Sequence, residues 1–256
     1  MGDNWLLETS GLTKIFGSRT VVDRLNLRIG KGDIYGFLGR NGSGKTTAIR
    51  MITGLVHPDA GKVRIGGYDL KTQFKAAIAQ VGAIVENPAF YAYLSASDNL
   101  RLMANLHPGV TRKRVDEALE IAGLTERAKD KVGSYSLGMK QRLGIAGALL
   151  HRPKLIILDE PTNGLDPQGM REIKELIAQL AAEQGISFLI SSHLLHEIEQ
   201  ICTRIGIIRK GKLVAERDVG QLLAAEGRAA EAEAAGRSRT LEQLFFAMTE
   251  EGERNA

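Results

Sequence analysis

The chain has 256 residues, of which 43% are apolar and 25% are charged, and its single cysteine, Cys202, excludes an internal disulfide. Its longest stretch without Asp, Glu, Lys or Arg spans residues 184–196, which is too short for a membrane helix of about 20 apolar residues. The amino terminus shows no signal-peptide pattern, so we expect a cytoplasmic protein. The net charge of +4 is spread along the chain, so we expect no nucleic-acid partner.

Short β-rich runs fill the first 37 residues, and an apolar strand at 34–38 leads into a glycine-rich loop. After this loop we expect a helix at 46–56 and a strand at 61–67. An apolar run at 81–85 is typical of a strand buried on both faces.

From about residue 95 to 152 the apolar residues recur at helical spacing. Helices are predicted there at 98–106, 111–122 and 137–150, and Pro153 stops the last of them. Strands and helices then alternate, with strands at 154–158, 186–190 and 204–208 and helices at 168–183 and 194–201. This alternation predicts a parallel sheet with helices on its faces.

The predicted fold is therefore α/β: a mostly parallel sheet with flanking helices, an N-terminal antiparallel β subdomain, and an α-helical subdomain inserted at about 87–150. Residues 1–220 form one domain in this interpretation, and residues 221–256 form a C-terminal helical extension. Within the extension, 222–239 resemble a frayed helix or a linker, and a docking helix follows. Cys202 ends a predicted helix and is interpreted as a small buried hydrophobic residue.

Residues 39–46 fit the phosphate-binding pattern G-x-x-x-x-G-K-[ST] without a mismatch, between a predicted strand and a predicted helix. Glycines let backbone N–H groups converge on one anion, and the N-terminus of the helix attracts negative charge. We expect Lys45 at the β/γ-phosphates, also as a catalytic group, and the Thr46 hydroxyl on Mg²⁺. The residues predicted to bind the nucleotide in this loop are Gly39, Asn41, Gly42, Ser43, Gly44, Lys45, Thr46 and Thr47. The loop predicts a protein that binds a nucleoside triphosphate.

Two acids follow the apolar strand at 154–158, at the strand end where ligands of doubly wound sheets bind. Asp159 is suited to hold Mg²⁺, and Glu160 to polarise a water for in-line attack. A surface-facing acidic pair is the alternative. His193 follows the strand at 186–190 and either holds the attacking water with Glu160 or has only a structural role.

Six features occur in one order along the chain: Phe16, the phosphate loop, residues 135–142, residues 158–162, residues 164–167 and His193. Together, over roughly residues 5–215, they resemble the ATP-binding subunit of ABC transporters. The resemblance implies ATP and Mg²⁺ as cofactors, a transmembrane permease as partner, and a peripheral position on the cytoplasmic face of the membrane.

The resemblance also implies roles for single residues. Phe16 matches the aromatic that stacks on adenine, with a core aromatic as the alternative. Ser136 and Gly138 match the signature that opens a helix toward the γ-phosphate held by a second copy of the chain. Asp166 matches the loop that crosses the interface, so that two chains hold two ATP molecules head to tail and hydrolysis releases them.

The chain departs from the family at two places. Leu137 and Met139 stand where the family usually has Gly and Gln, and we expect Met139 simply to pack. Glu86 stands where a glutamine normally bridges Mg²⁺, water and the permease. A carboxylate can still ligate Mg²⁺, and a solvated loop acid without a catalytic part is the alternative.

The sequence around these departures resembles that of the family branch that exports bacitracin- or lantibiotic-type peptides. This resemblance implies an ATPase that powers export of a peptide antibiotic or drug. Phe90, Tyr91 and Tyr93 lie where the family receives a cytoplasmic helix of the permease, and they either line that groove or pack inside the insertion.

The alternative function is a soluble ABC-type ATPase that acts on ribosomes or chromosomes. Such proteins usually carry two ATPase domains or a long coiled coil, and the insertion here shows no sustained heptads. A GTPase is disfavoured because the Asn-Lys-x-Asp motif for guanine is absent from the sequence, and a phosphotransferase because the sequence gives no sign of a second substrate pocket.

Overall fold

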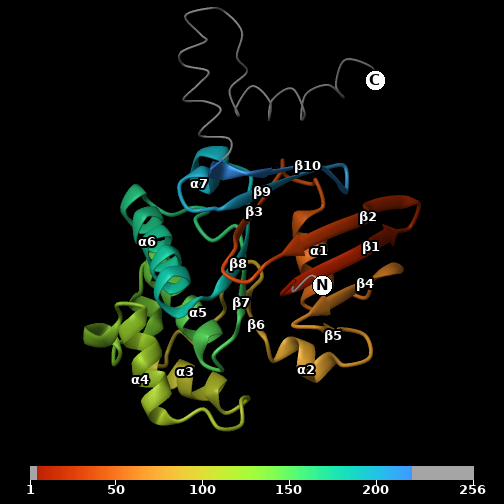
Figure 1. Cartoon of the computed structure of the whole chain (residues 1–256). Helices are drawn as coiled ribbons and strands as arrows, with labels where there is room; N and C mark the ends of the chain where they lie inside the picture. Colours follow the sequence, from red (N-terminus) through yellow and green to blue (C-terminus); the bar gives the residue numbers. More distant parts are fainter. Residues whose placement is uncertain (1–4, 221–256) are drawn as a thin grey trace, which may run out of the picture.

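Residues 5–220 are described by the structure, a computed structural model with two β-sheets and a separate group of helices (Figure 1). The two sheets lie next to each other, and the helices α3 and α4 lie at one end of the molecule (Figure 1). None of the helices within the described residues is long and apolar enough to span a bilayer.

The larger sheet has six strands in the order β10-β9-β3-β8-β7-β6. They are β3 (Ile34–Leu38), β6 (Val81–Ile84), β7 (Leu155–Asp159), β8 (Ser187–Ser192), β9 (Arg204–Arg209) and β10 (Lys212–Asp218). Strand β3 pairs in parallel with β8 and β9, so that Leu38 lies opposite Ser192 on one side and Ile207 on the other. Because parallel strands bring their carboxyl ends to one edge, the residues after β3, β7 and β8 meet at that edge.

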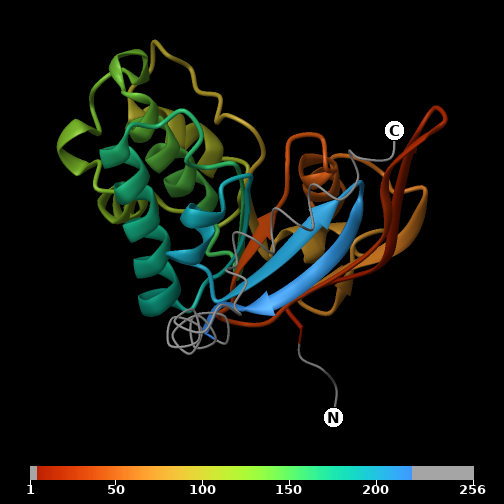
Figure 2. The ribbon, with the colours of Figure 1, turned by 90° about the horizontal axis from the view of Figure 1, so that it is seen from above.

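The smaller sheet is antiparallel, in the order β2-β1-β4-β5. Its strands are β1 (Leu7–Phe16), β2 (Arg19–Ile29), β4 (Ala60–Ile65) and β5 (Tyr68–Asp69). With helix α1 (Lys45–Ile52) it covers one face of the six-stranded sheet, and the short helix α2 (Phe74–Ile78) follows β5 (Figures 1 and 2). A buried cluster that includes Leu27, Ile49 and Ile157 joins these elements, and the predicted N-terminal antiparallel part is confirmed.

Helices α5 (Leu137–Leu149), α6 (Pro167–Gln184) and α7 (Leu195–Glu199) cover the opposite face of the six-stranded sheet (Figure 1). Neighbouring residues of a strand point to opposite faces, and Ile156 and Ile157 accordingly belong to two different core clusters. Cys202 is buried in the cluster beneath α7, as predicted, and this burial raises the pKa of its thiol.

Helices α3 (Ala96–Ala104) and α4 (Arg112–Ile121) pack with α5 around a third cluster that includes Leu100, Leu119 and Leu143. The hydroxyls of Ser95 and Thr111 cap the two helices by accepting hydrogen bonds from backbone N–H groups of their first turns. Short 3₁₀ turns at Thr125–Arg127 and Val132–Ser134 lead from α4 to α5.

Three local differences from the sequence-based expectations have physical causes. Helix α1 ends at Ile52, not at residue 56, because the chain turns at Gly54, whose φ is 76°. Strand β6 is at the edge of its sheet and Ala83 is exposed, so burial on both faces is wrong for this strand. Strand β10 and helix α2 were not expected, because β10 is largely exposed with a weak apolar pattern and α2 has only five residues. The helices expected after residue 221 lie outside the described residues.

Candidate active site

The phosphate loop joins β3 to α1, and two of its glycines have no room for a side chain. A Cβ at Gly39 would lie 2.6 Å from both the Ile208 carbonyl oxygen and the Ser43 hydroxyl. A Cβ at Gly44 would lie 2.7 Å from the Val21 carbonyl oxygen, and its φ of 109° also disfavours other residues. The loop therefore requires glycine at Gly39 for packing, and at Gly44 for both packing and conformation.

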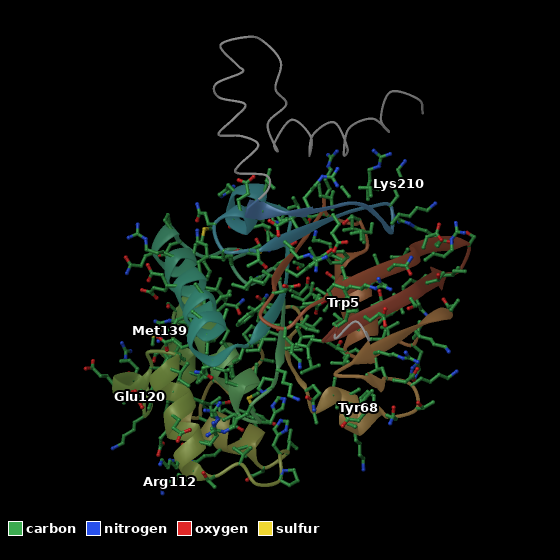
Figure 3. All side chains as sticks on the ribbon, in the orientation of Figure 1. Trp5, Tyr68, Arg112, Glu120, Met139 and Lys210 are labelled. Atoms are coloured by element: carbon green, nitrogen blue, oxygen red, sulfur yellow. The ribbon has the colours of Figure 1, made fainter. Side chains whose placement is uncertain are left out.

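Backbone hydrogen bonds hold the loop from two sides. The Gly39 N–H donates to the Ser192 carbonyl at the end of β8 (3.2 Å). The turn between β9 and β10, where Figure 3 labels Lys210, packs against the other side. There the Gly211 N–H donates to the Ser43 carbonyl (2.8 Å), and the Gly211 carbonyl accepts from the Asp23 N–H (2.9 Å).

The first turn of α1 is left open to an anion. Gly44 is its N-cap, no side chain caps the helix, and no acid lies in its first turn. The Ser43 hydroxyl is buried without a hydrogen-bond partner in the described part of the chain. Uncapped N–H groups and an unpaired hydroxyl are groups that a phosphate satisfies.

Lys45 is buried at the start of α1, with 6% of its surface exposed. Its Nζ donates to the carbonyls of Gly39 (2.6 Å) and Arg40 (3.4 Å) and lies 3.2 Å from Glu160 Oε1. The ammonium group is thus held beside the loop by the Glu160 carboxylate and by two carbonyls of the loop backbone.

Glu160 and His193 meet across the ends of β7 and β8. Glu160 Oε2 lies 2.8 Å from His193 Nδ1, and its Oε1 forms the ion pair with Lys45. The Glu160 backbone has a φ of 50°, a left-handed conformation that is uncommon outside glycine. Strained backbone of this kind costs of order 1–3 kcal/mol and concentrates at functional sites.

Ser191 fixes the two acids relative to each other. Its hydroxyl donates to Asp159 Oδ1 (2.5 Å) and accepts from the Glu160 N–H (2.9 Å). Asp159 itself is 5% exposed, so its carboxylate is buried at the strand end and the surface-facing alternative is wrong for it. Ser191 was not among the predicted site residues. Its position two residues before His193 was the sequence signal that could have indicated it.

These residues surround a cavity of about 310 Å³. Its lining consists of Val21, Asn41, Gly42, Ser43, Gly44, Lys45, Thr46, Thr47, Glu160, Asn163 and His193. The structure therefore brings the predicted loop residues together with Glu160 and His193. Asn163 and Val21 were missed: Asn163 lies three residues after Glu160, whereas Val21 belongs to β2 and carries no sequence signal.

The other predicted residues do not line this cavity. Phe16 ends β1 with 52% of its surface exposed and with Lys14 Nζ 5.3 Å from its ring centre, so a core position is wrong. Glu86 pairs with Arg50, one helical turn after Thr46 on α1. Its side chain is 62% exposed.

Ser136, Gly138 and Asp166 lie on two helix starts away from the cavity. The Ser136 hydroxyl caps α5 by accepting from the Met139 N–H (3.2 Å), and Asp166 caps α6 by accepting from the Gly169 N–H (2.9 Å). A Cβ at Gly138 would come no closer than 3.6 Å to the Cα of Gly169. Met139, labelled in Figure 3, packs against the helical cluster, as predicted.

A phosphate loop between strand and helix, with an acid and a histidine at the neighbouring strand ends, defines a phosphate-loop NTPase. The family described as ABC transporter matches residues 22–163. The chain is 52% identical over 211 residues to the bacitracin transport ATP-binding protein BcrA of Bacillus licheniformis, which covers 82% of this chain and 69% of that protein. It is 40% identical over 213 residues to the lantibiotic transport ATP-binding protein SrtF of Streptococcus pyogenes, which covers 83% of this chain and 91% of that protein.

A solved structure extends the comparison to the fold. The dimeric post-hydrolysis structure of the ATP-binding cassette MJ0796 with ADP and Pi matches with a TM-score of 0.74 and 26% identity, over 83% of this chain and 98% of that one. The chain belongs to the ABC transporter family, whose ATP-binding domain it carries, and it is an ATPase.

Proposed function

We propose that this chain hydrolyses ATP to power a separate membrane permease that exports a peptide antibiotic or drug. The observation that carries the ATPase part is the cavity in which the phosphate loop, Glu160 and His193 converge. The transport part rests on the relatives named for bacitracin and lantibiotic transport. In this proposal residues 1–220 are the ATPase domain, with a helical insertion at 87–150, residues 221–256 are an extension, and the permease holds the chain at the cytoplasmic face of the membrane.

The phosphate loop binds the triphosphate through the N–H groups of residues 41–47 and the Lys45 ammonium group. Lys45 exchanges its ion pair with Glu160 for the β/γ-phosphates, which frees the carboxylate. Thr46 and Asp159 would hold Mg²⁺, which when bound would neutralise charge on the phosphate oxygens. Among residues 5–220 no group of three His, Cys, Asp or Glu side chains could hold a metal ion by itself.

Glu160 acts as the base that accepts a proton from the attacking water, and His193 orients that water. Because His193 Nδ1 is bonded to Glu160, its Nε2 remains for the nucleotide.

Phe16 stacks on the adenine ring in this proposal. Its exposed face and its position at the end of β1 support this role, since a flat base needs an accessible aromatic surface.

A second copy of the chain completes the site. Ser136 and Gly138 open α5, whose N-terminus then points at the γ-phosphate bound by the other copy, and Asp166 lies in the loop that crosses the interface. The space around Gly138 supports this arrangement, because nothing nearby in its own chain demands glycine there. The similar cassette MJ0796 is dimeric.

Tyr91 and Tyr93 form the permease contact. Their rings are 5.9 Å apart, and 56% and 68% of their surfaces are exposed, respectively. Phe90 instead packs against the helical cluster. Glu86 reaches Mg²⁺ in this proposal only after it leaves Arg50, which lies one turn along α1 from Thr46.

The test is first to determine whether a neighbouring reading frame encodes a polytopic membrane protein, and then to produce that protein together with this chain. We expect the two to purify as one complex and ATP hydrolysis to be faster in it than in the ATPase alone. A variant with Tyr91→Ala and Tyr93→Ala should hydrolyse ATP alone but not join the complex, whereas Tyr68→Ala, at an exposed tyrosine of the smaller sheet, should join it. Isolation with ribosomes or DNA in place of the membrane protein would support the soluble alternative.

A further inference from the structure

Glu197 is a buried acid outside the nucleotide cavity. It lies on α7, four residues after His193, and only 5% of its surface is exposed. Its Oε2 accepts hydrogen bonds from the hydroxyl of Thr162 (2.7 Å) and from the hydroxyl of Ser192 (3.2 Å). Both donors are neutral, and both are buried as well.

The two hydroxyls belong to different loops of the site. Thr162 begins a turn in which its carbonyl accepts from the Leu165 N–H (3.1 Å), immediately before Asp166. Ser192 ends β8 and immediately precedes His193, and its hydroxyl also accepts from the Leu194 N–H (3.0 Å). One carboxylate oxygen therefore joins the loop that leads to Asp166 to the loop that carries His193.

Burial of a carboxylate is costly unless hydrogen bonds compensate it, and of the two bonds here the one from Thr162 is short (2.7 Å) and the one from Ser192 is longer (3.2 Å). Removal of the acceptor leaves the buried Thr162 hydroxyl without this partner, whereas the Ser192 hydroxyl still has the Leu194 carbonyl at 3.4 Å as an acceptor. The loop that leads to Asp166 then loses its link to the loop that carries His193. The effect on chemistry passes through His193, because His193 in turn holds Glu160 at 2.8 Å.

We propose that Glu197 is a positioning residue that couples the Asp166 loop to His193. The inference rests on the proposed function, in which the Asp166 loop contacts a second copy of the chain. Contact at that loop shifts the Thr162 turn, and the shared carboxylate passes the shift to Ser192 and His193. Hydrolysis thereby depends on closure of the dimer.

The experiment measures steady-state ATP hydrolysis of Glu197→Ala, Glu197→Gln, Thr162→Val and His196→Gln. Glu197→Ala should lower kcat about 10- to 100-fold, the effect of losing hydrogen bonds to a charged group, with the KM for ATP within about threefold of wild type. Glu197→Gln keeps an acceptor oxygen and should restore most of kcat. Thr162→Val should lower kcat in the same direction, and His196→Gln, at an exposed position of the same helix, should match wild type.

A double variant separates positioning from general stability. If Glu197 acts through His193, Glu197→Ala should slow the His193→Ala enzyme no further. Additive losses, an equal rise in KM, or wild-type kcat in both Glu197→Ala and Thr162→Val would overturn the inference. If Glu197→Ala does not fold, Glu197→Gln and Thr162→Val decide the question.

The proposed function is tested separately with the Glu160→Gln enzyme. If that protein does not dimerise with ATP, the shared site itself is wrong. If it dimerises while the Glu197 variants keep wild-type kcat, only the coupling through Glu197 is wrong.

Discussion

The phosphate-loop region and the region from Ser136 to Met139 each combine a glycine and a hydroxyl with the start of a helix, yet they are constructed differently. A Cβ at Gly39 would lie 2.6 Å from Ile208 and Ser43 atoms, whereas a Cβ at Gly138 would make only an ordinary contact, 3.6 Å from the Cα of Gly169. Lys45 is 6% exposed and contacts Glu160, whereas Leu137 is 39% exposed.

The packing around Gly39 and Gly44 explains why the fold needs glycine at these two positions. No described residue near Gly138 gives such a reason, so the role of Gly138 in a site shared by two copies stays a prediction. Two of the four predictions below test this contrast, and the other two concern acid and histidine groups outside it; they run from the largest expected effect to the smallest.

Glu160→Gln should slow ATP hydrolysis by about 10²–10⁴-fold, the usual contribution of a general base. ATP binding should persist, because the loop N–H groups and Lys45 remain. ATP-dependent dimers should accumulate, as measured by phosphate release and by size-exclusion chromatography with Mg²⁺ and ATP. Wild-type turnover in this variant would remove Glu160 as the base.

Alanine at Gly39 and alanine at Gly138 form a matched pair. Gly39→Ala forces a Cβ to 2.6 Å from two oxygens and should destabilise the fold by at least about 1–3 kcal/mol and weaken ATP binding. Gly138→Ala should leave Tm equal or higher, since alanine favours helix, yet it should reduce ATP-driven dimerisation. Thermal unfolding measures the stability of the two variants, ATP titration measures their ATP binding, and size-exclusion chromatography measures their dimerisation. A lower Tm in Gly138→Ala would contradict the contrast.

Glu86→Gln should keep ATP binding. It removes an exposed ion pair with Arg50, and such pairs contribute about 0–1 kcal/mol. Calorimetric titration with ATP should give a Kd within a few-fold of wild type, with Arg50→Gln as the matched variant. Loss of binding in Glu86→Gln alone would mean that the peripheral role of this acid is wrong.

The smallest expected effect concerns His151, whose protonation should make the stability of the protein depend on pH. Its Nε2 lies 2.9 Å from the Val81 carbonyl oxygen, and its ring stacks on that of His107 with 4.4 Å between the ring centres. Its Nδ1 is buried and has no hydrogen-bond partner among residues 5–220. Burial lowers the pKa of His151, and His107 and Arg114 lower it further, while the hydrogen bond with Val81 opposes them.

Because the pKa of His151 is lower in the folded state, the unfolded chain binds more protons as the pH falls through about 6.5. Stability is therefore highest with neutral His151 and declines on acidification. His151→Gln should lose less Tm than wild type between pH 7.5 and 5.5. An identical loss in both proteins would assign the pH dependence to other groups.

Local sequence pattern predicted much of this molecule. The buried strand β7 follows from its unbroken apolar run, and the phosphate loop follows from glycine and lysine spacing, because these features act within a few residues. The burial of Cys202 and the packing of Met139 were likewise predicted from residue type and helical spacing.

What sequence could not predict are contacts between distant residues. The pairing of Glu86 with Arg50, and the hydrogen bonds of Ser191 with Asp159 and Glu160, join residues more than thirty positions apart and leave no periodic trace. Strand β10 was missed because its exposed edge position removes the apolar alternation. The catalytic and binding roles of the site residues remain predictions that the variants above test.

The position of β3 between β8 and β9 also sets an order of events during synthesis. The phosphate loop is translated early, but its supports at Ser192, Ile208 and Gly211 follow more than 150 residues later. At about 5–20 residues per second the ribosome needs roughly 10–30 s to supply them. Meanwhile the helical part, whose contacts are local, can fold first. The nascent chain therefore gains an ordered ATP site only after nearly all of the described sequence has left the ribosome, so an incomplete product carries the motif without the binding site.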